Sequence, residues 1–312
     1  MQKIVYSSQK VFPLSSPGEN QKHTYTLPSG SHEFDFSFKL PSSTQCDTEN
    51  HESQPLPPTL PPRMYDMGQI KVQVRYELIA TIIKQSKFGL SKKKSFRREI
   101  VVIAVESLNP KYDGSEIRGR TETRLHIPNS PFETFPFRGD IYLRPGNFHS
   151  YTEPIAMQIE IYRPAITPGT QYRIALESIQ MAIHTNLYVA AKGKSMVYTK
   201  EPSKQFFCKK NLDSTIFELD DKKEVVTLDE SIWWDEALCP DLTPSFLVCN
   251  LGIDYALEVT LEIKVGTELQ KFTMSVQSFN ISSGVPALVG SDGSASIGLD
   301  LNKVPSYASV LR

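Results

Sequence analysis

Hydrophobic and polar residues alternate along several segments of the chain, and this period of two predicts β-strands. In the segment Gly-Ser-His-Glu-Phe-Asp-Phe-Ser-Phe-Lys-Leu, residues 30–40, His32 and the phenylalanines share one parity, while charged and hydroxyl residues share the other. A strand with one buried and one solvated face has this pattern. The alternation returns at residues 70–80, 155–161 and 172–183.

These segments predict an order of elements along the chain. Strands are expected over residues 24–40 (a pair joined by a turn at 28–30), 72–83, 99–107, 155–161, 172–183 and 255–265. The run Ile-Val-Val-Ile-Ala-Val within 99–107 predicts burial on both faces. Prolines between residues 41 and 62 remove backbone donors and predict a loop with an extended edge. Polar residues 198–224 predict a loop with weak strand signals.

No window sustains a 3.6-residue apolar period over three turns. The predicted fold class is therefore all-β, with two tandem immunoglobulin-type β-sandwich domains. Turn-forming residues predict where the domains meet. They are Asn109, Pro110, Asp113, Gly114 and Gly119. We expect a partial N-terminal sandwich at residues 1–112, a C-terminal sandwich at 113–285, and a flexible tail rich in Gly and Ser at 286–312.

Composition supports sizeable cores and indicates no global attraction to polyanions. The 312 residues are 39% hydrophobic and 10% aromatic, with a formal net charge of -1. This balance favours no nucleic-acid partner. The N-terminus lacks the apolar core of a signal peptide, and no apolar run approaches the length of a membrane span. The spacing of the cysteines does not indicate a metal site, and we expect them to be reduced thiols. We expect a cytosolic protein without cofactors.

One segment departs sharply from this charge balance. Seven basic residues and no acidic residue lie between the strands expected at 72–83 and 99–107. They are Lys84, Lys87, Lys92, Lys93, Lys94, Arg97 and Arg98. A structural interpretation is a solvated hairpin loop whose charges keep a sheet edge from pairing with other chains. A functional interpretation is contact with anionic lipid headgroups or acidic client segments, at about 1 kcal/mol per cation near a charged membrane.

Two ordered blocks of the sequence resemble the α-arrestins. The first, within residues 30–80, is a Gly-x-His-x-Phe-x-Phe segment ending in Leu-Pro, a Leu-Pro-Pro segment, and a run ending Tyr-x-Leu-x-Ala. The second, Pro-Asp-Leu-Thr-Pro-Ser-Phe-Leu-Val-Cys-Asn-Leu-Gly-Ile-Asp-Tyr-Ala-Leu-Glu-Val at 240–259, is similar to the C-terminal arrestin domain. Few residues precede the first block, where the family carries several strands. We therefore expect an N-terminally truncated, fungal-like member with an incomplete N-terminal sandwich.

The resemblance implies the function of a trafficking adaptor. Members of this family bind plasma-membrane transporters or receptors and recruit a HECT-type ubiquitin ligase through its WW domains, so that ubiquitin marks the client for endocytosis. Val304, Pro305, Ser306 and Tyr307 resemble a degenerate form of the Pro-Pro-x-Tyr motif that binds WW domains. The implied location is cytoplasmic, peripheral to the plasma membrane or endosomes.

Two alternative functions stay open. An arrestin-fold sorting or scaffold protein would bind partners at its sheet edges without any ligase. A carbohydrate-active β-sandwich enzyme would pair carboxylates across neighbouring strands, where sequence cannot reveal them. The adjacent pairs Asp220-Asp221 and Asp229-Glu230 do not meet this need, because neighbouring side chains on a strand point to opposite faces. The sequence carries no nucleophile elbow, phosphate-binding glycine loop or dinucleotide fingerprint, so we expect no enzyme.

Overall fold

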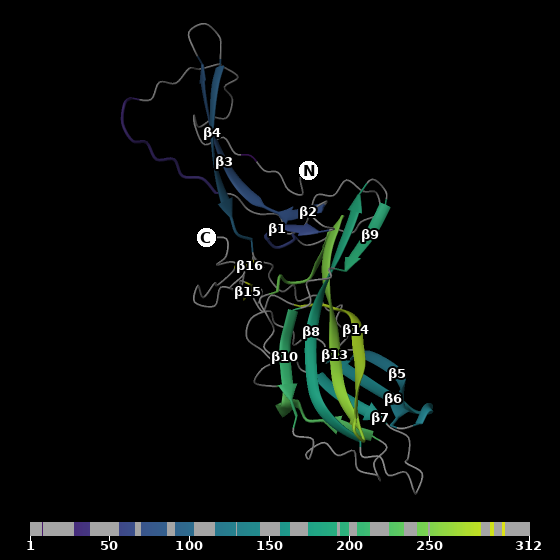
Figure 1. Ribbon diagram of the computed structural model, residues 1–312. Coiled ribbons are helices and arrows are strands. Elements are labelled where there is room, and N and C mark those ends of the chain that lie inside the picture. Colours follow the sequence, from purple (N-terminus) through teal and green to yellow (C-terminus); the bar gives the residue numbers. More distant parts are fainter. Residues whose placement is uncertain are drawn as a thin grey trace. The chain divides into compact units, whose positions relative to one another are not determined.

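The computed structural model of the chain is an all-β structure of several antiparallel sheets (Figure 1). It describes residues 8, 28–37, 56–65, 70–85, 91–102, 116–128, 130–143, 157–162, 174–191, 194–199, 205–212, 225–233, 242–248, 250–281, 288–289 and 295–296. The chain divides into two compact units, residues 1–56 and 57–312, and the described strands lie in the second. Within these ranges the helical structure is the 3-10 turn η2 (Glu230–Ile232), and no helix has the length and apolar character needed to cross a bilayer.

Strands make up most of the regular structure in these ranges. In chain order they are β1 (Leu60–Tyr65), β2 (Ile70–Val74), β3 (Tyr76–Gln85), β4 (Ser91–Ile100), β5 (Ile117–Ile127), β6 (Ser130–Leu143), β7 (Met157–Tyr162), β8 (Ile174–Ala191), β9 (Lys194–Thr199), β10 (Gln205–Asn211), β11 (Val225–Leu228), β12 (Phe246–Val248), β13 (Leu251–Val265), β14 (Glu268–Phe279), β15 (Leu288–Val289) and β16 (Ala295–Ser296).

The larger sheet is built on two long antiparallel strands, β8 and β13. Their register runs from Ile174 opposite Val265 to Val189 opposite Leu251, and Figure 1 shows the two ribbons side by side. β10 and β9 pair with successive parts of β8, while β14 and β12 pair with successive parts of β13. Alternate positions of β13 are large, apolar and buried. The strands predicted at 172–183 and 255–265 are therefore confirmed.

The second sheet has the order β11-β7-β6-β5, and its neighbours are antiparallel. Met157, Ile159 and Ile161 of β7 point inward and are at most 2% exposed, whereas the residues between them are half-buried. This alternation confirms the strand predicted at 155–161. The buried residues of both sheets belong to one continuous hydrophobic core.

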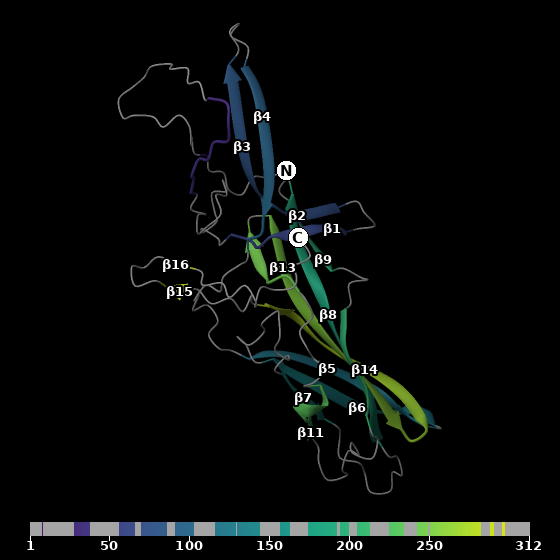
Figure 2. The same cartoon turned by 90° about the vertical axis from the view of Figure 1, so that its left-hand side faces the viewer.

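The two sheets pack face to face in a β-sandwich-like arrangement. The ring of Phe137 in β6 meets the ring of Phe272 in β14 edge-on, with centroids 4.9 Å apart. Gly119 lets β5 approach β14 closely, because a Cβ there would lie 2.3 Å from the carbonyl oxygen of Ser275. Figure 2 shows β5 and β14 lying alongside each other. One side of the sandwich is thereby closed by the meeting of these two strands.

A buried corner fixes the entry into β13. The hydroxyl of Tyr255, which is fully buried, donates to the carbonyl of Thr243 at 2.5 Å. The N–H of Ser245 donates to the carbonyl of Ile281 at 2.7 Å, and the hydroxyl of Ser245 accepts the N–H of Ile281 at 2.9 Å. The segment before β12, the strand β13 and the residues after β14 are therefore held together as one unit.

The N-terminal predictions hold only in part. Residues 28–37 carry no strand, and Phe34 and Phe36 are 40% and 56% exposed, so the buried face predicted for the first alternating segment is wrong there. Alternation produces a strand only where another strand supplies backbone partners. The proline-rich stretch does end in an extended edge: β1 contains Pro61 and Pro62, and its register with β2 is irregular at these prolines, which have no N–H to donate.

Other predicted boundaries also shift. The strand predicted at 72–83 is two strands, β2 and β3, interrupted at Arg75. Of the strand predicted at 99–107, residues 99 and 100 end β4, Val101 is 41% exposed instead of buried, and residues 103–107 lie outside the described residues. Residues 205–211 form β10 rather than a loop. The predicted boundary at 112 lies outside the described residues, as does the predicted tail except for β15 and β16, which pair with each other.

Candidate functional site

The basic residues singled out from the sequence lie on a two-stranded hairpin, so the predicted loop is wrong. β3 and β4 pair in register from Tyr76 opposite Ile100 to Gln85 opposite Ser91. The composition of residues 91–98 is typical of a solvated loop, but regular backbone pairing with the apolar strand β3 holds this segment as a strand. The described basic side chains are all exposed. They are Lys84 on β3 and Lys92, Lys93, Lys94, Arg97 and Arg98 on β4, while Lys87 lies outside the described residues.

The other residues considered from the sequence either lie outside the described residues or have a structural role. Residues 304–307, the tail motif, lie outside the described residues, and so does the pair Asp220-Asp221. Asp229 caps the 3-10 turn η2, where its Oδ1 accepts the N–H of Ser231 at 2.8 Å. This hydrogen bond lowers the pKa of Asp229. The carboxylate therefore has a structural role at the start of η2.

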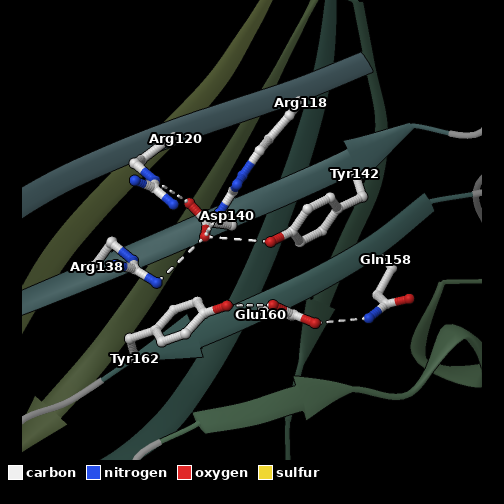
Figure 3. A network of polar contacts seen from close by, with 8 residues as sticks. All are labelled: Arg118, Arg120, Arg138, Asp140, Tyr142, Gln158, Glu160 and Tyr162. Atoms are coloured by element: carbon white, nitrogen blue, oxygen red, sulfur yellow. Dashed lines mark hydrogen bonds and ion pairs between the residues drawn. The ribbon is translucent and has the colours of Figure 1, made fainter. Parts of the chain in front are cut away.

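A polar cluster that we did not predict lies on the outer face of β5, β6 and β7 (Figure 3). We name it the Arg–Tyr face. Its members are Arg118, Arg120, Arg138, Asp140, Tyr142, Gln158, Glu160 and Tyr162. The strand register sets Arg120 directly opposite Asp140 on β6, and Asp140 directly opposite Glu160 on β7. Residues distant in sequence are thereby brought together on one surface.

Asp140 is the centre of the Arg–Tyr face. Its side chain is 0% exposed, and in Figure 3 three guanidinium groups converge on it. Arg118 donates to Oδ2, Nε of Arg120 donates to Oδ1 at 3.0 Å, and Arg138 forms an ion pair with Oδ2 at 3.6 Å. Burial acts to raise the pKa of Asp140, but the hydrogen bonds from Arg118 and Arg120 outweigh it and lower the pKa.

Two tyrosines hold the arginines in place. The guanidinium of Arg138 lies 3.7 Å from the ring centroid of Tyr162, and that of Arg118 lies 4.9 Å from the ring centroid of Tyr142. The hydroxyl of Tyr162 donates to Glu160, whose other oxygen accepts the amide of Gln158 at 2.8 Å (Figure 3). Burial raises the pKa of Tyr142, which keeps its hydroxyl protonated. The network thus fixes its side chains before any partner arrives.

The Arg–Tyr face has an excess of hydrogen-bond donors. Each guanidinium carries five N–H groups, and the carboxylate oxygens of Asp140 and Glu160 are already occupied within the network. The side chains of Arg118, Arg120 and Arg138 remain 30–45% exposed. Chemically, this surface suits a partner that supplies carboxylates or other acceptors.

The same geometry does not suit a glycosidase pair. Asp140 and Glu160 are carboxylates on neighbouring strands, the arrangement that the enzymatic alternative requires. A general acid, however, needs a raised pKa and access to the substrate. Asp140 has a lowered pKa and a fully buried side chain.

The sequence did contain one signal for the Arg–Tyr face. Arg118, Arg120 and Arg124 share a parity, so on a strand they share a face. The other positions of β5 include Gly119, Thr121 and Thr123. These residues give no apolar alternation, so the strand itself was not predicted. Asp140 and Glu160 come from other strands, and only the sheet register brings them close.

A cleft of about 300 Å³ lies on the outer side of β2, next to the end of β4. Two of the charged residues in its lining pair with each other, since Arg75 forms an ion pair with Glu99 at 3.0 Å, and Arg75 also pairs with Glu77 at 2.5 Å. In the part of the chain that the structure describes, no group of three His, Cys, Asp or Glu side chains is placed to hold a metal ion.

The chain matches no family model and no curated protein.

Proposed function

We propose that this chain is a non-catalytic, arrestin-like adaptor with two tandem sandwich domains. It binds an acidic cytoplasmic segment of a plasma-membrane transporter or receptor at the Arg–Tyr face. Residues 304–307 recruit the WW domains of a HECT-type ubiquitin ligase, which attaches ubiquitin to the client and commits it to endocytosis. The protein works in the cytoplasm, at the surface of the plasma membrane or endosomes.

The observation that carries the proposal is the preorganised excess of donors on the Arg–Tyr face. Arginine and tyrosine, together with tryptophan, are enriched among the interface residues that contribute most to protein–protein binding. Both kinds are held in this face by the buried carboxylate of Asp140 and by Glu160, so binding orders few additional side chains. Within the Arg–Tyr face, three arginines outnumber two carboxylates, which favours an acidic client segment.

The arrestin-like assignment draws support from the residues that carry the resemblance. Thr243, Ser245 and Tyr255 belong to the sequence block at 240–259, and the hydrogen bonds of the buried corner connect them with each other and with Ile281. The block is therefore a structural unit of the sandwich.

A binding measurement with an acidic probe tests the client site. The full chain is titrated into a fluorescently labelled twelve-residue peptide rich in glutamate, and the anisotropy is followed. Arg120→Gln removes one guanidinium of the face and is expected to weaken binding about tenfold. Arg124→Gln is the matched control, because Arg124 lies on the same strand but bonds to Thr134 outside the network. Equal affinities of the two variants would refute the assignment of this face.

A further inference from the structure

The β3–β4 hairpin separates apolar from cationic residues by strand. Its register sets Leu78 opposite Arg98, Ile79 opposite Arg97, Ile82 opposite Lys94, Ile83 opposite Lys93, and Lys84 opposite Lys92. Aliphatic side chains of β3 thus lie beside basic side chains of β4 along the hairpin. Residues 78–98 contain seven Lys and Arg and no Asp or Glu. The nearest acidic residues, Glu77 and Glu99, both pair with Arg75 at the base.

Large apolar side chains are exposed on both faces of this hairpin. Because side chains alternate along a strand, Ile79 and Ile83 lie on one face, while Ile82 and Phe96 lie on the other. Their exposed fractions are 54%, 66%, 61% and 50%. Within the described residues, β3 and β4 pair with each other alone. These four large apolar side chains are exposed beside the basic residues of β4, and such exposed apolar groups indicate an interaction surface.

The placement of these residues indicates what covers them. An acidic peptide added to the edge of β4 would neutralise the cations, but it would leave the isoleucines of β3 in water on both faces. The boundary between headgroups and acyl chains of a bilayer surrounds a two-stranded ribbon, and anionic headgroups attract the cations at the same depth. The ammonium of Lys94 lies 4.9 Å from the Phe96 ring centroid. A charged group and an apolar ring are therefore adjacent, the combination found in side chains at membrane interfaces.

We propose that the β3–β4 hairpin binds directly to anionic lipid bilayers, with Ile79, Ile82, Ile83 and Phe96 inserted at the headgroup boundary and the basic side chains of β4 among the phosphates. This inference goes beyond the proposed function, because it requires neither a client nor a ligase. It also gives separate partners to two surfaces: acidic protein segments bind the Arg–Tyr face, and lipid binds the hairpin.

Vesicle flotation with the full chain tests the proposal. Vesicles of phosphatidylcholine with added phosphatidylserine are expected to carry the wild-type protein, and vesicles of phosphatidylcholine alone are not. Ile82→Ser with Ile83→Ser, and separately Lys93→Gln with Lys94→Gln, should each weaken binding about tenfold or more. The matched controls are Leu247→Ser, an exposed apolar residue on β12, and Lys71→Gln with Lys209→Gln, exposed cations outside the hairpin. Both controls should bind as the wild type does.

Insertion has its own readout in Phe96→Trp. Its additional fluorescence should shift to shorter wavelength on phosphatidylserine vesicles and be quenched by brominated acyl chains, relative to the wild type with its two native tryptophans. If the isoleucine variant floats like the wild type while the lysine variant does not, attachment is purely electrostatic and insertion is refuted. If polyglutamate binds the hairpin and phosphatidylserine vesicles do not, the partner is an acidic peptide and the proposal fails. Unchanged thermal melting of all variants establishes that the effects are local.

Discussion

The side-chain amide of Gln270 in β14 makes two hydrogen bonds to the backbone of His126 in β5. Its Oε1 accepts the N–H of His126 at 2.8 Å, and its Nε2 donates to the carbonyl of His126 at 2.7 Å. The side chain of Gln270 thereby satisfies the backbone N–H and C=O groups of His126, as a neighbouring strand would. Together with the close approach at Gly119, this contact joins the two sheets along the side where β5 meets β14.

Replacement of Gln270 tests this contact. Gln270→Glu keeps an acceptor for the N–H of His126, but it removes the donor and turns a carboxylate toward the carbonyl. The free energy of unfolding should fall by about 1 kcal/mol at neutral pH. Gln277→Glu on the same strand is the control, since the exposed side chain of Gln277 donates to the hydroxyl of the nearby Ser275. Urea unfolding compares the two, and an equal loss in both would show that the cross-sheet contact is unimportant.

The two core glycines should respond differently to alanine. At Gly119 the added Cβ would lie 2.3 Å from the backbone oxygen of Ser275, which cannot move without shifting β14. At Gly139 it would lie 2.1 Å from the sulfur of Met274 and 2.7 Å from Cε1 of Phe272, and both are side-chain atoms, which can shift more readily than a backbone oxygen. Gly119→Ala should therefore destabilise by about 3 kcal/mol and Gly139→Ala by about half as much. Thermal unfolding ranks them, and the reverse order would contradict this packing.

Asp140 should make stability depend on pH in the acid range. Because its pKa is lowered on folding, the carboxylate contributes stability above the ordinary aspartate pKa near 3.9, and that contribution is lost as the pH falls through the folded-state pKa. Asp140→Asn should cost about 2 kcal/mol at pH 7. The difference in melting temperature from the wild type should shrink toward pH 3. A difference that stays constant from pH 7 to pH 3 would show that Asp140 is not charged in the native protein.

The buried corner at Tyr255 gives a fourth prediction. Tyr255→Phe removes the donor to the Thr243 carbonyl while keeping the ring that lies 6.2 Å from the Phe279 ring, measured between centroids. Stability should fall by about 1–2 kcal/mol, because a buried acceptor loses its hydrogen bond. Tyr188→Phe, on a half-exposed position of β8, is the control. Calorimetry that finds no difference between the two variants would remove the corner from the elements that stabilise the sandwich.

The sequence predicted strands whose inward residues are mostly aliphatic. Apart from Thr185 and Tyr255, β7, β8 and β13 have mainly Ile, Leu, Val or Met at their alternate buried positions, so burial and sequence pattern coincide. It missed β5, where Gly119 and the inward threonines interrupt the apolar pattern that defines a strand. Close packing of β5 against β14 favours glycine at position 119. Because glycine adds no apolar side chain, the same residue that allows this packing makes the strand undetectable from a hydrophobicity pattern.

The candidate sites divide in the same way. The cations of the hairpin could be found from the sequence because they are close together along the chain, although their placement on β4 depends on pairing with β3. The Arg–Tyr face could not be found, because Arg120, Asp140 and Glu160 become neighbours only through the register of three strands. A buried carboxylate with several cationic partners is a product of sheet topology, and no local spacing encodes it.

A bridging assay tests the adaptor proposal most directly. Tandem WW domains of a HECT-type ligase are fixed to beads, the full chain is added, and retention of the fluorescent glutamate-rich peptide is measured. The proposal predicts that the wild type retains the peptide, that Tyr307→Ala abolishes retention of both chain and peptide, and that Arg120→Gln abolishes retention of the peptide while the chain stays on the beads. Retention of the wild-type chain without the peptide would contradict the client site, and failure of the wild-type chain to bind the beads would contradict the adaptor itself.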